Sequence, residues 1–313
     1  MHLLTPFASA LSEASSHVLR DLHLPNLAGL LARLTPTAPD AGDEYSLSPP
    51  HERALAAAWG WRGGDGALPF AAHAAALDGV DVGELAWGLV TPAHWHVGRD
   101  HVTLADPEAL QLSETESRAA FEAVRELFES EGFTLVWGAP SRWYGAHDSL
   151  AELPCAALDR VIGRNVDLWI RHGAAFQSQA RRVRRLQSEV QLLLYPHALN
   201  EEREQRGALT LNSFWLSGCG RAQAVTANAV VVNDTLRAPL LAQDWVAWAD
   251  AWRALDSGAL ATLLADARAG RTTSLTLCGE RNAQRFDNNA RSLWQRLGSR
   301  FKSPAPHTIL EAL

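Results

Sequence analysis

The sequence predicts an α/β fold in which a mixed, mostly parallel sheet is flanked by helices. Short apolar segments typical of buried strands alternate with segments of helical periodicity through much of the chain. The 313 residues suffice to bury a large core, and 47% hydrophobic with 20% charged residues is an ordinary globular composition. No linker is visible, so we expect one α/β unit over residues 1–313 without an internal boundary.

The first part of the chain is expected to begin with a strand and to continue with helices. Residues 2–7 form the strand, and Pro25 occupies the first turn of the second of two helices that follow. Pro50 and Pro69 open two alanine-rich helices. Residues 35–50 are proline-rich, acidic and without periodicity, which predicts a loop that could serve as a lid.

The middle of the chain contains one helix with a well-defined start. Ser113 and Glu116 have the spacing of a capping box, in which each side chain binds a backbone N–H of the other residue. The helix that they open is expected to stop at Gly132. Strands are expected at residues 84–91, 101–104 and 133–137.

The remainder is expected to alternate again between helices and strands. Residues 176–194 carry apolar side chains every three or four positions, which predicts a long amphipathic helix. Asp244 is placed to cap another helix. Further strands are expected at residues 211–216, 225–232 and 273–278, and further helices at 258–270 and 281–297.

The charge balance limits the classes of partner. The chain has 28 basic and 35 acidic residues, a net charge of −7. Nucleic acid is not an expected partner, because phosphate contacts need a basic field. A small anionic molecule or another protein is expected instead, and the oligomeric state stays open. The 12 tryptophans either pack in the core or form a stacking surface.

The cysteines and the amino terminus bear on the compartment. Cys155, Cys219 and Cys278 are far apart and form no C-x-x-C pair, so we expect three reduced, mostly buried thiols. The first residues lack the basic and apolar segments of a signal peptide. No stretch has the length of a transmembrane helix. The cytoplasm is therefore the expected location.

The densest group of chemically capable side chains follows the strand at residues 84–91. His94 and His96 are two apart, which places both on one face of an extended segment. With Asp100 and His101 they could bind a divalent metal such as Zn, Mn or Fe, or a histidine could act alone as acid or base. The alternative is a polar loop whose histidines bond the backbone. The spacing resembles the HxHxDH motif of metallo-β-lactamase-like hydrolases, although three residues instead of one separate His96 from Asp100.

Two pairs of arginines are candidates for binding an anion. Arg160 and Arg164, and likewise Arg181 and Arg185, are one helical turn apart. Guanidinium groups match the geometry of phosphates and carboxylates. The alternative is a solvated face on which the arginines pair with acidic residues such as Glu189.

A Gly-x-Gly sequence follows the strand at residues 211–216. It resembles the start of a dinucleotide fingerprint, but Gln223 stands where a third small residue is needed. We expect a tight turn whose backbone N–H groups could cradle an anion. The candidate residues of this ligand loop are Asn212, Trp215, Gly218 and Gly220.

Several segments together resemble the RpfE-type regulatory proteins of proteobacteria. The resemblance spans nearly the whole chain, and members of that family are often labelled as regulatory or as cofactor-independent phosphoglycerate mutases. The segments that carry it are residues 3–8 (LLTPFA), 24–27 (LPNL), 91–95 (TPAHW), 158–167 (LDRVIGRNVD) and 211–218 (LNSFWLSG).

Two of these segments also resemble parts of the alkaline-phosphatase superfamily. Residues 24–27 are similar to its TPNL segment, and residues 212–220 are similar to the N-x-x-W-x-x-G-x-G segment of archaeal-type cofactor-independent mutases. The resemblance implies a fold like that of phosphoglycerate mutase and alkaline phosphatase. The superfamily's Asp ligand after the first strand, its Asp-His pair near the carboxyl end and its Ser or Thr nucleophile have no counterpart here.

The resemblance therefore implies a degenerate site, because two-metal phosphoryl transfer needs those missing ligands. The function expected from it is that of a cytoplasmic regulatory or ligand-binding protein. The alternative is a metal-dependent hydrolase or phosphotransferase that uses His94, His96, Asp100 and His101.

Overall fold

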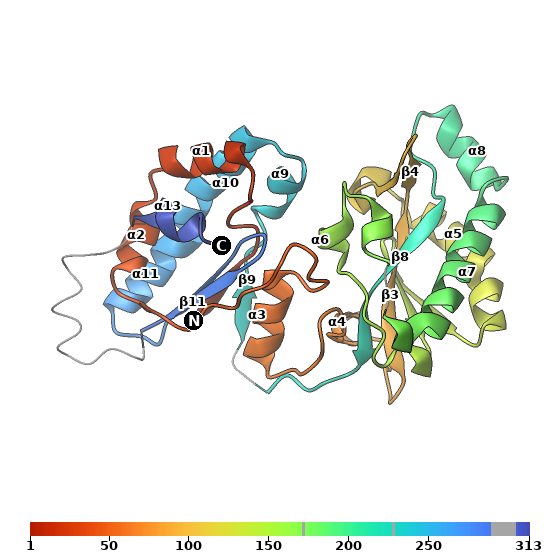
Figure 1. Ribbon diagram of the computed structural model, residues 1–313, viewed down its shortest axis with the longest axis horizontal. Helices are drawn as coiled ribbons and strands as arrows, with labels where there is room; N and C mark the ends of the chain where they lie inside the picture. Colours follow the sequence, from red (N-terminus) through yellow and green to blue (C-terminus); the bar gives the residue numbers. More distant parts are fainter. Residues whose placement is uncertain (171–172, 227–228, 289–304) are drawn as a thin grey trace. The chain divides into compact units, whose positions relative to one another are not determined.

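The computed structural model describes residues 1–170, 173–226, 229–288 and 305–313 (Figure 1). It divides into two compact units, and each is described by itself. Unit 1 consists of Met1–Glu44, Pro49–Gly60 and Val225–Leu313, and unit 2 consists of Tyr45–Ser48 and Trp61–Ala224. Two of the changes of unit, at residues 44–45 and 48–49, fall within the proline-rich segment that the sequence predicted as a loop of one undivided unit.

Unit 1 contains a mixed five-stranded sheet. Its order is β2-β11-β10-β1-β9. The strand β1 lies between β9 and the central strand β10 and runs parallel to both, whereas β11 is antiparallel to β10 and to β2. The strands are β1 (His2–Thr5), β2 (Thr35–Pro36), β9 (Val230–Val232), β10 (Ser274–Cys278) and β11 (Ala283–Asp287).

The helices of unit 1 bury leucines and tryptophans in one core. Trp248 and Trp252 of this core are fully buried. The buried carboxylate of Asp256 accepts hydrogen bonds from the backbone N–H groups of Asn26 and Leu27, at 3.2 and 2.8 Å, and so caps the start of α2. The helices are α1 (Glu13–Asp21), α2 (Pro25–Leu31), α3 (Pro50–Trp59), α9 (Arg237–Leu241), α10 (Trp245–Leu255), a π-helical turn (Asp256–Leu260), α11 (Ala261–Arg268) and α13 (Pro306–Leu310).

Two expectations change in unit 1. The expected helix at residues 281–297 is wrong over its first part, because β11 occupies Ala283–Asp287 and buries Ala283 and Phe286; residues 289–297 lie outside the described residues. The expected loop at residues 35–50 begins as β2 and continues beside β11, where the N–H of Asp40 donates to Ala283 O at 2.9 Å, while its residues 45–48 belong to unit 2. Backbone pairing thus organises a segment that has no helical or strand periodicity.

Unit 2 contains an antiparallel four-stranded sheet in the order β6-β7-β3-β8. The expectation of a mostly parallel sheet is therefore wrong here: β6 and β7 form a tight hairpin, and tight hairpins pair antiparallel strands. A separate hairpin joins β4 and β5. The strands are β3 (Ala86–Ala93), β4 (Trp95–Val97), β5 (Val102–Leu104), β6 (Thr134–Ala139), β7 (Arg142–Ala146) and β8 (Ser213–Arg221).

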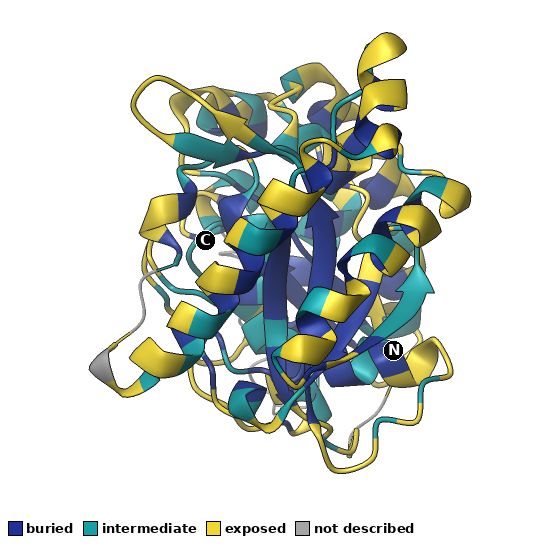
Figure 2. Cartoon of the chain, turned by 90° about the vertical axis from the view of Figure 1, so that its right-hand side faces the viewer, coloured by how far each residue is buried: buried dark blue, intermediate teal, exposed yellow. Residues whose placement is uncertain are grey.

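Helices cover both faces of the unit 2 sheet. Trp87 and Tyr144 pack with α4 on one face. On the other face, α7 and Phe128 of α5 pack with Phe214 of β8. Figure 2 shows the buried strands behind helices whose outer faces are exposed. The helices are α4 (Phe70–Leu77), α5 (Glu114–Ser130), α6 (Leu158–Val161), α7 (Gln177–Leu194) and α8 (Ala198–Gln205).

The strongest local predictions are confirmed in unit 2. Ser113 and Glu116 form both hydrogen bonds of the capping box at the start of α5. The long amphipathic helix is α7, which begins at Gln177 and ends at Leu194. Within the described residues, no helix is both long and apolar enough to cross a membrane.

Candidate functional site

His94 and His96 lie together directly after β3. The half-buried His94 donates from Nδ1 to the carbonyl oxygen of Thr210 at 2.8 Å. Its Nε2 lies 3.0 Å from Nδ1 of the exposed His96, which is hydrogen-bond distance. The predicted placement of the two rings on one face is confirmed, as is the alternative in which a histidine bonds the backbone.

Asp100 and His101 do not join this pair. His96 is paired with Thr103 across the β4–β5 hairpin, and the N–H of Gly98 donates to His101 O at 3.0 Å, so both residues lie in the exposed turn. No three His, Cys, Asp or Glu side chains in the described ranges form a group that could hold a metal ion. The predicted four-residue cluster is therefore split by the turn.

The first arginine pair flanks a tryptophan. The buried Arg160 donates from Nε to Ser46 O at 2.8 Å. Its guanidinium carbon is 5.2 Å from the centroid of the Trp169 ring, and that of Arg164 is 5.8 Å from the same ring. Both distances fall in the range of cation–π interactions. The spacing of the pair thus serves a shared contact with Trp169.

The second arginine pair lies on the exposed side of α7. Arg181 donates to Gln177 Oε1 at 3.4 Å. Arg185 donates to Glu189 Oε1 at 2.8 Å and lies 3.2 Å from Glu131 Oε1. The hydrogen bond to Glu189, together with the charges of both glutamates, raises the pKa of Arg185. Arg185 therefore pairs with acidic residues on a solvated face, as in the alternative to anion binding.

Asn212 and Trp215 act on the chain around β8. The Asn212 side chain accepts from the N–H of Trp95 at 2.7 Å and donates to its carbonyl oxygen at 2.9 Å. Trp215 is buried and donates from Nε1 to Ala156 O at 2.8 Å. Asn212 thus fixes the backbone beyond β3, while Trp215 holds the segment before α6.

The two glycines lie inside β8, and the predicted turn and anion cradle are not formed. The β3–β8 register shifts beside them, which marks a β-bulge, and Gly218 has a φ of +62°. A Cβ on Gly218 would lie 2.9 Å from Ala71 N, and one on Gly220 would lie 3.0 Å from Pro69 Cβ. The Gly-x-Gly sequence therefore lets the start of α4 approach the strand.

Gly218→Ala is expected to lower the free energy of unfolding by about 1–3 kcal/mol, because it adds both left-handed strain and a backbone clash. Chemical denaturation followed by circular dichroism measures this loss. Gly163→Ala is the matched control: its φ is +72°, but its added Cβ would meet nothing within 4 Å. Equal losses in the two variants would contradict a role in close packing.

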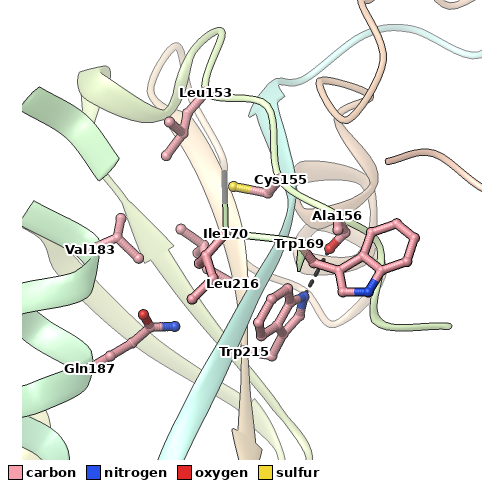
Figure 3. A pocket seen from close by; sticks show the side chains of 9 residues that line it. All are labelled: Leu153, Cys155, Ala156, Trp169, Ile170, Val183, Gln187, Trp215 and Leu216. Atoms are coloured by element: carbon pink, nitrogen blue, oxygen red, sulfur yellow. Dashed lines mark hydrogen bonds between the residues drawn. The ribbon is translucent and has the colours of Figure 1, made fainter. Parts of the chain in front are cut away.

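A tryptophan-lined pocket lies within unit 2. The hollow is open on one side, and the space between its atoms, counted together with adjoining open solvent, is about 300 Å³; Figure 3 shows its wall. A second hollow of about 230 Å³ shares Val183 and Leu216 with it. The lining residues are Leu153, Cys155, Ala156, Trp169, Ile170, Val183, Gln187, Trp215 and Leu216.

The pocket wall contains a buried donor without a partner. Trp169 is 4% exposed, and its Nε1 has no hydrogen-bond partner among the described residues. In Figure 3 the edge of the indole that carries this nitrogen faces Trp215. The side-chain amide of Gln187 also lines the wall, and it donates to Phe214 O at 3.3 Å. An unpaired buried N–H is costly unless a ligand or water accepts from it.

The sequence signals for this pocket were present but weak. Trp169 is one of 12 tryptophans, and the sequence distinguishes it from the others only by the arginines near it, two of which contact its ring. Gln187 interrupts the apolar face of α7 at helical spacing from Val183 and Val190, and a buried amide on such a face indicates a polar requirement. Of the residues that the sequence analysis named as candidate site residues, Trp215 is the one that lines the pocket.

Comparison with known proteins finds distant structural likeness only. No family model matches the chain, and no curated protein matches it. A cofactor-independent phosphoglycerate mutase from Thermoplasma acidophilum is 13% identical, with 100% of this chain and 99% of that chain covered and a TM-score of 0.35. The PH0037 protein from Pyrococcus horikoshii is 12% identical, with 99% and 95% covered and a TM-score of 0.48.

Proposed function

We propose that the protein is a ligand-binding protein that recognises a small molecule in the tryptophan-lined pocket of unit 2. The observation that carries the proposal is the buried, unpartnered Nε1 of Trp169 in the wall of that pocket. Small-molecule sites are typically apolar hollows with a few fixed polar groups. A regulatory role through such binding follows the resemblance to the RpfE-type proteins.

The lining defines the chemistry of the ligand. Leu153, Val183 and Leu216 offer apolar contact, and the indoles of Trp169 and Trp215 offer flat surfaces for a planar group. The Trp169 N–H requires an acceptor oxygen or nitrogen. The positive charges beside Trp169 favour an acceptor that is itself negative. A planar, largely apolar molecule with one anionic acceptor satisfies all these groups.

Trp169→Phe tests the proposal, because it keeps an aromatic ring while removing the indole N–H together with part of the indole ring system. The probe is anilinonaphthalene sulfonate, which combines planar apolar rings with an anionic acceptor. We expect its Kd to rise about tenfold in the variant, the effect of losing one hydrogen bond to a charged group. Fluorescence titration measures the Kd.

Trp245→Phe, in α10 of unit 1, is the control and should leave the Kd unchanged. Trp169 is buried, so the smaller ring is expected to lower the melting temperature, and circular dichroism at the titration temperature establishes that the variant is folded. A Kd equal to that of the unaltered protein would contradict the proposal, as would an absence of saturable binding.

A further inference from the structure

Two buried cysteines of unit 2 face each other across the pocket wall. Cys155 lies in the segment before α6 and Cys219 lies in β8, and their Sγ atoms are 3.6 Å apart. Both thiols are free. A disulfide has an S–S distance of about 2.05 Å, so closure would require a movement of only ~1.5 Å.

The surroundings of the two thiols differ in access. Cys155 is 7% exposed and lines the pocket, and its N–H is fixed by a 2.9 Å hydrogen bond to Gly66 O. Cys219 is fully buried. Opposite it, an added Cβ on Gly88 would lie 3.1 Å from the Cys219 sulfur, so the glycine leaves room for that side chain. A reagent in the pocket therefore meets Cys155 first.

We propose that Cys155 and Cys219 form a reversible dithiol–disulfide couple that is oxidised by a hydroperoxide entering through the pocket. This activity goes beyond ligand binding and does not depend on it. The third cysteine, Cys278, lies buried in β10 of unit 1 and serves as an internal reference.

The hydrogen bond between the thiols and the position of each one assign their roles. The Cys219 thiol donates to Cys155 Sγ. This bond and complete burial both raise the pKa of Cys219, so it stays protonated. Cys155 lines the pocket, where a hydroperoxide can reach its sulfur, whereas Cys219 is fully buried behind it. Cys155 is therefore the attacking thiol and Cys219 the resolving thiol.

The reaction proceeds in two steps. The Cys155 thiolate attacks the peroxide, the O–O bond breaks, and the alkoxide leaves and takes up the proton that Cys155 lost, which gives an alcohol and a sulfenic acid. Cys219 then attacks the Cys155 sulfur, the S–S bond forms, and hydroxide leaves with the Cys219 proton as water. Two thiols are oxidised and the hydroperoxide accepts their two electrons.

Oxidation of the folded, fully reduced protein with cumene hydroperoxide tests the couple. We expect the free thiols to fall from three to one and the mass to fall by two hydrogens. Proteolysis should release a peptide pair joined through Cys155 and Cys219, and dithiothreitol should restore the original mass. Circular dichroism before and after establishes that the protein stays folded.

Three variants separate the steps. Cys219→Ala should stop the reaction at a Cys155 sulfenic acid that dimedone labels, whereas Cys155→Ala should leave Cys219 as an unmodified thiol. Cys278→Ser should form the Cys155–Cys219 bond as the unaltered protein does. Failure to recover that joined peptide pair from folded protein would overturn the proposal, as would oxidation of Cys278 at the same rate. Neither outcome bears on whether anilinonaphthalene sulfonate binds.

Discussion

Arg203→Ala is expected to lower the free energy of unfolding by about 3–5 kcal/mol, the cost of breaking a buried ion pair from one side. The side chain of Arg203 is 0% exposed. It lies in α8, donates from Nε to Leu209 O at 2.6 Å and also donates to Leu110 O. A further bond of 2.6 Å reaches Glu116 Oε1 in α5. The substitution leaves two carbonyl groups and a carboxylate short of a donor.

Urea unfolding measured by circular dichroism tests this expectation. Arg206→Ala is the matched control, because Arg206 also binds Glu116 but its side chain is 54% exposed. An exposed ion pair of this kind contributes about 0–1 kcal/mol. Similar losses in the two variants would show that burial of Arg203 is not what makes the pair stabilising.

Acidification is expected to remove the stability that ionised Glu116 contributes. Burial alone would raise the pKa of Glu116, but hydrogen bonds from Ser113, Arg203 and Arg206 outweigh it and lower the pKa from its usual 4.5 to about 2. A group whose pKa is lower in the folded state contributes stability at pH values above its unfolded pKa. That stability is lost as the pH falls through the folded pKa. The window is therefore from about pH 4.5 down to about pH 2, with a total effect of about 3 kcal/mol.

The measurement is the free energy of unfolding across that window in the unaltered protein and in Glu116→Gln. Glutamine cannot ionise, so we expect its profile to be flatter by the Glu116 contribution. Other groups also titrate in acid, including Asp78, whose pKa is lowered chiefly by its hydrogen bond from Arg142. The difference between the two profiles isolates Glu116, and parallel profiles would refute its role.

Glu116 also shows which contacts a sequence can predict. Its bond to Ser113 follows from a spacing of three residues, and the structure confirms it. Its partner Arg203 lies 87 residues away, and no local periodicity connects the two. Contacts within a helical turn are encoded in spacing, whereas contacts between α5 and α8 depend on how the helices pack.

The strands show the same division between local and distant information. Apolar runs place β1, β3, β5, β6 and β10 within two residues of their observed ends, whereas the short strands β2, β4 and β7 are not predicted. The pairing of the strands was not predicted, since the alternation of side chains along a strand does not depend on whether its neighbour is parallel or antiparallel. The strand β11 was mistaken for part of a helix, because only Ala283 and Phe286 of its residues are buried.

The candidate site was predicted in part for a related reason. Spacing alone placed His94 beside His96, but a turn separated Asp100 and His101 from them. The pocket draws its wall from β8, α7 and the segments around Cys155 and Trp169, so no single stretch of sequence shows it. Side chains that converge from separate elements become visible only once the fold is known.

The division of the chain has a consequence for dissecting the protein. The long stretch of unit 2, Trp61–Ala224, starts and ends side by side: Arg62 and Gln223 exchange two hydrogen bonds of 2.9 and 2.6 Å. It can therefore be excised as one continuous fragment. Such a fragment lacks Tyr45–Ser48, however, and with it the carbonyl oxygen of Ser46 that accepts from Arg160. A version meant to fold on its own therefore needs another acceptor for the buried Arg160 side chain.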